Sequence, residues 1–143
     1  MLTLALALAV AGDLPKEVRE AFEKAESFEL YSLNPAVEAK TGFHGSLVLG
    51  KLTLKGDDAK AVREAIEKGA KDSDGRVAKC FVPRHGIRVG EIDLVICFQC
   101  LQAHVHQGEK MTDSFPTTSA PAAVLNKFLA AAGIPLPEQP RKK

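Results

Sequence analysis

The pattern that most constrains the fold of this chain is a change of parity in its apolar residues between positions 92 and 105. Apolar residues alternate along two adjoining segments, which are Ile92, Leu94, Ile96 and Phe98 and then Leu101, Ala103 and Val105. Alternation with a period of two is typical of a strand with one buried face. Because the second segment has the opposite parity, either a bulge interrupts one strand or the chain reverses tightly between Cys97 and Cys100. A reversal sets Leu94 opposite Val105.

A second hairpin is predicted around Gly90, and it would join this stretch to a strand expected at residues 76–82. Centred on Gly90, the pairing sets Cys80 beside Cys100. The chain has three cysteines, the third being Cys97. We therefore expect all of them to converge at one end of a three-strand meander.

The same registers place three of the four histidines on one face of the sheet, opposite the leucines. His85 would lie on one side of Val95 and His104 on the other, with His106 two residues further on. Such imidazoles could hold one metal ion with an open position for water, and Asp93 is the nearest candidate general base. The alternative is an ordinary polar outer face.

The rest of the chain indicates an α+β fold. The helical spacing of apolar residues predicts helices at residues 13–26, 57–69 and 121–133. Strand patterns predict strands at residues 28–33, 46–54 and 111–115. A loop is expected up to Gly45, and a bulge or bend at Gly50 and Lys51 would repair a parity change. With helices at both ends and strands in consecutive runs, we expect a mostly antiparallel sheet with about three helices packed on one face.

The first twelve residues are apolar and allow three interpretations. Residues 1–12 have the length of a signal-peptide core but lack a preceding positive charge, and they also alternate like an edge strand or could extend a helix. They are too short to cross a membrane. A signal peptide predicts a periplasmic or secreted protein, and the other interpretations a cytoplasmic one. We expect residues 13–134 to form a single α+β domain and residues 135–143 a flexible tail.

The net charge of +1 excludes a strong field for polyanions, so we expect no nucleic-acid partner. The absence of tryptophan and the single tyrosine also count against a surface for single-stranded nucleic acid. No partner is identified by the sequence, and a protein partner or a second copy of the chain is left open.

A structural zinc site is the first chemical interpretation of the central stretch. Cys80, Cys97 and Cys100 would give three thiolates, and His85 is the best fourth ligand, in the spacing C-x4-H followed by C-x2-C. Copper(I) would suit the same thiolates. Buried unliganded cysteines are the plain alternative, and a disulfide that leaves one cysteine over is another. A thioredoxin-like dithiol is disfavoured because Leu101 continues as strand rather than helix.

Three further side chains carry weaker signals. Arg84 and Arg88 flank His85 and could hold an anion or a carboxylate. His44 is a spare ligand in a glycine-rich segment.

The block CFVPRHGIR at residues 80–88, followed by DLVICFQC at residues 93–100, resembles a family of small, uncharacterised bacterial proteins that often carry export signals. The resemblance covers residues 28–137. The resemblance implies that the protein is exported and that the two parts of the block belong together. It implies no particular reaction. The sequence thus predicts a small metal-binding accessory protein, with a thiol-redox or metal-dependent enzyme as the alternative.

Overall fold

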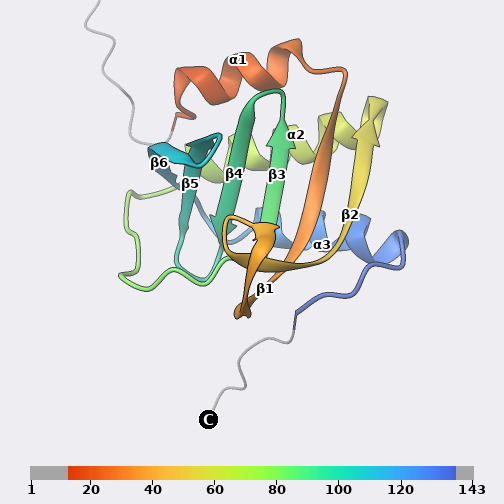
Figure 1. Cartoon of the computed structure of the whole chain (residues 1–143). Coiled ribbons are helices and arrows are strands. Elements are labelled where there is room, and N and C mark those ends of the chain that lie inside the picture. Colours follow the sequence, from red (N-terminus) through yellow and green to blue (C-terminus); the bar gives the residue numbers. More distant parts are fainter. Residues whose placement is uncertain (1–12, 138–143) are drawn as a thin grey trace, which may run out of the picture.

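The computed structural model of the chain describes residues 13–137 and contains one six-stranded antiparallel sheet. Its strands are β1 (Ser27–Phe43), β2 (Ser46–Lys55), β3 (His85–Val89), β4 (Ile92–Cys97), β5 (Gln102–Gln107) and β6 (Lys110–Pro116). They lie in the order β2-β1-β3-β4-β5-β6 (Figure 1). The segments predicted at residues 1–12 lie outside the described residues.

Three helices are described, α1 (Lys16–Lys24), α2 (Gly56–Lys71) and α3 (Pro121–Ala131). In Figure 1, α2 and α3 cross behind the sheet and α1 lies along its upper end. The buried stripes of the helices pack against one face of the sheet, including Val18 of α1, Val62 of α2 and Leu125 of α3, each with 0% exposure. The predicted α+β fold is therefore confirmed. Within residues 13–137 no helix is long and apolar enough to span a membrane.

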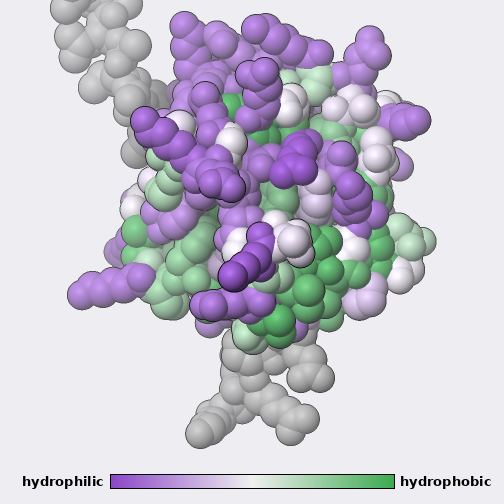
Figure 2. All heavy atoms as spheres, viewed as in Figure 1, coloured by the Kyte–Doolittle hydropathy of each residue, from purple (hydrophilic) through white to green (hydrophobic). Residues whose placement is uncertain are grey.

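The sheet alternates as its sequence predicts, so its two faces have different compositions. Ile87, Leu94 and Val105 point to the helices and belong to the main core. The uncovered face has a smaller apolar cluster formed by Tyr31, Leu33, Phe43 and Val95. Figure 2 shows this face, where hydrophilic residues are crowded at the top and centre and apolar residues gather at the lower right.

The β1–β2 hairpin is longer than predicted and forms an arm. The chain was expected to leave the sheet after residue 33, whereas β1 continues to Phe43 with register shifts after Ser32 and Asn34. β2 does contain a bulge, but its unpaired residue is Leu49 rather than Gly50 or Lys51, because Ser32 pairs with Gly50 and Leu33 pairs with Val48. Residues 34–46, here called the arm, curl in front of the sheet at β3 (Figure 1).

The two central hairpins differ in how well their registers were predicted. The β4–β5 hairpin pairs Leu94 with Val105, as expected. The β3–β4 hairpin turns at Gly90 as expected, but it pairs His85 with Ile96 rather than with Val95. The turn consists of two residues after Val89, so its centre lies half a residue beyond Gly90. A shift of one residue moves a side chain to the other face, and the predicted position of His85 is therefore wrong.

The strand predicted at residues 76–82 is also wrong. This segment has no regular secondary structure and runs past the β4–β5 turn as a loop. Two amides attach it there, since Ala78 N donates to Cys100 O at 2.8 Å and Val82 N donates to Cys100 Sγ at 3.4 Å. At the other end of the described chain, Ser32 Oγ donates to Pro135 O at 2.7 Å, within the segment predicted as a tail.

Candidate binding groove on the uncovered face

Two adjoining hollows lie between the arm and the uncovered face of the sheet. The larger has a volume of about 570 Å³ and includes Arg88 and Asp93 in its lining. The other has about 500 Å³, and its lining includes the apolar side chains of Phe81 and Val95 and the polar side chains of His104 and Glu38. Residues shared by both are Lys40, His44, Gly45 and His106. We call the two hollows together the groove.

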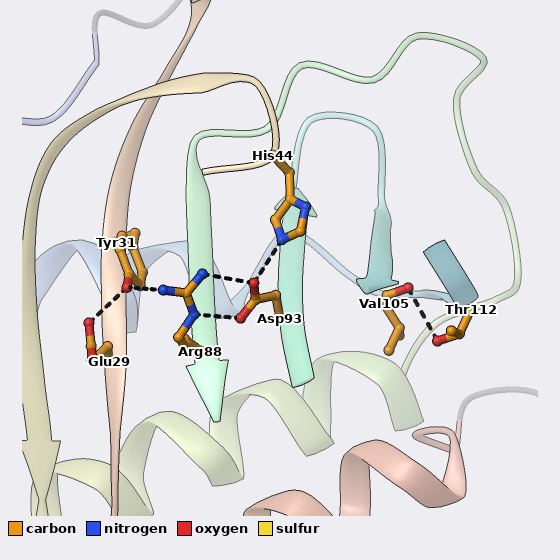
Figure 3. A network of polar contacts seen from close by, with 7 residues as sticks. All are labelled: Glu29, Tyr31, His44, Arg88, Asp93, Val105 and Thr112. Atoms are coloured by element: carbon orange, nitrogen blue, oxygen red, sulfur yellow. Dashed lines mark hydrogen bonds and ion pairs between the residues drawn. The ribbon is translucent and has the colours of Figure 1, made fainter. Parts of the chain in front are cut away.

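A chain of polar contacts crosses the groove and ends at His44 (Figure 3). Arg88 binds Asp93 in a bidentate manner, with Nε to Oδ1 at 2.8 Å and Nη2 to Oδ2 at 3.0 Å. Oδ2 also lies 2.8 Å from Nε2 of His44. Burial raises the pKa of Asp93, but the hydrogen bonds from Arg88 and His44 outweigh it and the pKa is lowered overall. Asp93 is therefore an ionised acceptor at neutral pH.

The same arginine links the groove to β1. Its Nη1 donates to the Tyr31 hydroxyl at 3.3 Å, and that hydroxyl donates to Glu29 at 2.7 Å. Burial, together with the bond to Glu29, raises the pKa of Tyr31 to about 12. Lys51 lies 3.1 Å from Glu29 and completes the row. Each of these charges has a partner of opposite sign.

The arm brings His44 to this site from a distant part of the sequence. His44 and Gly45 form its two-residue turn, and both have positive φ, 49° and 89°. Phe43 packs against β3 at Gly86, where a Cβ atom would lie 2.6 Å from the Phe43 ring. Only glycine leaves room for this contact. With Phe43 seated there, His44 reaches across β3 to Asp93 on β4.

Two stacked pairs of rings line the groove. The ring centroids of His44 and His106 lie 4.0 Å apart, and those of His104 and Phe81 lie 3.7 Å apart. Both β5 histidines point to the uncovered face, as predicted. Burial lowers the pKa of His104 and, with the neighbouring histidines, that of His106. These imidazoles are consequently neutral at pH 7.

The four predicted metal ligands are not brought together. Cys97 and Cys100 form a disulfide across the β4–β5 turn and both are fully buried, whereas Cys80 is an exposed free thiol. Within the described part of the chain, no group of three or more His, Cys, Asp or Glu side chains is arranged to hold a metal ion. In the groove, the rings of His44 and His106 stack on each other at an interplanar angle of 29°.

His85 lies on the helix-covered face and not with His104 and His106. Its Nε2 lies 2.7 Å from Asn126 Oδ1 of α3, and its ring contacts Phe98 edge to face. Only 4% of the residue is exposed, and its Nδ1 has no hydrogen-bond partner among the described residues. Burial lowers its pKa, so it is a neutral core residue.

The sequence identified some members of this site but not their arrangement, and it did not single out Phe81, Tyr31 or Lys40. Asp93 was noted only as a general base, Arg88 only as an anion ligand, and His44 only as a spare ligand. The Arg88–Asp93 pair could have been found from the β3–β4 hairpin, because these residues are directly opposite in the true register. Comparisons with protein-family models, curated proteins and solved structures found no match to this chain.

Proposed function

We propose that this protein is a binding module that holds a small polar ligand with an apolar or aromatic part in the groove. The observation that carries the proposal is the convergence of three imidazoles, His44, His104 and His106, on a hollow that also has apolar lining. A concave site with a few converging polar groups and shifted pKa values is typical of ligand binding. Phe81 and Val95 would contact the apolar part, and neutral imidazoles would exchange hydrogen bonds with the polar part.

The proposal can be tested with a set of small aromatic acids, phenols and amines added to the ¹⁵N-labelled full chain. We expect at least one compound to shift the backbone amide signals of Gly45, Val95 and His104 together, with saturation. A set that leaves all three signals unchanged would contradict the proposal.

A matched pair of variants locates the binding. His104 and Gln102 lie on the same strand and the same face, but only His104 lines the groove. We expect H104A to weaken binding by up to about tenfold, the size of one lost hydrogen bond, and Q102A to leave it unchanged. Equal effects of the two substitutions would mean that the compounds bind elsewhere.

The predicted metal site is a second candidate, for the reduced protein. Cys100 N donates to Cys97 Sγ at 3.0 Å and Val82 N to Cys100 Sγ, so both sulfurs already accept amide hydrogen bonds that would stabilise thiolates. The loop that carries Cys80 is attached to the same turn. Reduction would supply three thiolates to zinc or copper(I). His85 would have to leave Asn126 to become the fourth ligand.

Zinc uptake under two redox conditions tests this second candidate. We expect the reduced chain to bind about one zinc ion in competition with a chromophoric chelator, C80S to bind it more weakly, and the oxidised chain to bind none. A reduced chain that leaves all the zinc with the chelator would remove the candidate.

The Cys97–Cys100 disulfide also supports the proposal that the protein is exported, because disulfides persist in the periplasm and outside the cell. Determining the N-terminal residue of protein isolated from its native host tests this. An intact Met1 would contradict a cleaved signal peptide.

A further inference from the structure

We infer that His44 is a general base, held by Asp93 and Arg88 so that its Nδ1 can take a proton from water attacking a small acyl ester bound in the groove. The inference rests on the proposed function, because the substrate must occupy the same groove. It adds an activity that binding alone does not require.

The first step of the argument is the tautomer of His44. An ionised carboxylate can only accept a hydrogen bond, so the 2.8 Å contact with Asp93 Oδ2 requires the hydrogen on Nε2 of His44. In the neutral imidazole, the lone pair is then on Nδ1. Figure 3 shows that this second ring nitrogen points away from Asp93, toward the side of β5.

The second step is the support of the carboxylate. Asp93 has a side-chain exposure of 10%, and Arg88 fixes both of its oxygens. A base oriented by a third group is the arrangement that makes imidazoles effective in proton transfer. Asp93 and Arg88 therefore act as positioning residues, since neither needs to touch the substrate. The His44 ring packs against the rings of Phe43 and His106. Other charged or titratable groups that line the two hollows with it are Glu38, Lys40, His104 and Glu109.

The reaction that fits these groups is hydrolysis. Nδ1 of His44 removes a proton from water while the water oxygen bonds to the carbonyl carbon. The bond from that carbon to the leaving oxygen then breaks, and the imidazolium returns its proton to the leaving oxygen, giving an acid and an alcohol with no redox change. Lys40 lines the hollow and is a cation available to the developing oxyanion.

Hydrolysis of p-nitrophenyl acetate by the full chain tests the inference. We expect a rate above that of free imidazole at the same concentration, and a loss on the order of 10²-fold in H44A. Q102A, which changes a residue on the same face of β5 but outside the lining of the groove, should keep the rate. A native rate equal to that of free imidazole, or equal rates in H44A and the native protein, would overturn the inference.

The positioning role of Asp93 has its own readout. Long-range ¹H–¹⁵N spectra of the native protein should show the proton of His44 on Nε2, and D93N should show a mixture of tautomers with a shifted pH–rate profile. A native His44 protonated on Nδ1 would overturn the assignment without any variant. A chain that binds compounds in the groove but hydrolyses no ester would retain the proposed function and lose this inference.

Discussion

The two faces of the sheet are built from alternate residues of the same strands, but different interactions hold them together. On the covered face, aliphatic side chains such as Leu94 and Val105 are fully buried against three helices. On the uncovered face, Asp93 is held by hydrogen bonds to Arg88 and His44, and the His44 ring stacks on the His106 ring. The covered face therefore supplies most of the stability, whereas the uncovered face depends on the position of one arm.

The largest expected effect comes from removing a covered-face side chain. Leu94 is fully buried, and L94A should lower the free energy of unfolding by roughly 2 to 5 kcal/mol through lost burial and a cavity. H104A on the uncovered face should cost about 1 kcal/mol, the value of its ring stacking with Phe81. Urea denaturation of both variants measures the difference. Met111, which is 47% exposed, provides a control, and M111A should change stability by less than about 0.5 kcal/mol.

The next largest effect on stability should come from disturbing the contact between the arm and β3. G86A should lower the free energy of unfolding by roughly 1 to 3 kcal/mol, because its Cβ would collide with the Phe43 ring. The His44–Asp93 hydrogen bond should be lost with it, which the His44 tautomer reports. The control is the same substitution in an F43A background, where the collision is absent. If G86A costs as much there as in the native chain, the arm is not seated on Gly86.

The covered face could be predicted from the sequence because it follows simple periods. Apolar residues recur at helical spacing around Val62 and Leu125, and they alternate around Leu94. Each pattern can be buried in only one orientation of its helix or strand. The change of parity after Phe98 allowed either a bulge or a tight reversal, and the structure has the reversal. Short-range patterns therefore determined the layers and left two possibilities for the β4–β5 connection.

The uncovered face could not be predicted because it depends on turn geometry and long-range contacts. The two-residue turn at Gly90 places His85 on the covered face. This register also pairs the apolar Ile87 with Leu94 and Val89 with Ile92, so at this hairpin the sequence did contain a signal for it. The contact of His44 with Asp93 joins residues 49 positions apart. It requires the arm, whose irregular pairing through residues 34–46 follows no simple period.

A smaller effect on stability is expected from the protonation of histidines, and it should differ between the two faces of the sheet. The lowered pKa of His85 means that the unfolded chain binds its proton more readily, so this residue stabilises the fold above about pH 6.5 and less as the pH falls further. One such group contributes a slope of at most about 1.4 kcal/mol per pH unit. H85Q should flatten the fall in stability between about pH 6.5 and 5, and H104Q should flatten it less because His104 is only half-buried. A greater flattening in H104Q would contradict this order.

The smallest expected effect concerns Asp93. Its folded pKa is lowered, so its contribution to stability is present above its unfolded pKa of about 3.9 and is lost as the pH falls through the folded pKa. D93N should therefore weaken the acid dependence of the free energy of unfolding below about pH 4, measured by urea denaturation. D113N, on the exposed strand β6, should leave that dependence unchanged.

Because about half of the Arg88 side chain is exposed, salt should screen the Arg88–Asp93 pair and reduce the difference between native and D93N. A salt-independent difference would mean that burial of Asp93, rather than its pairing with Arg88, controls the carboxylate.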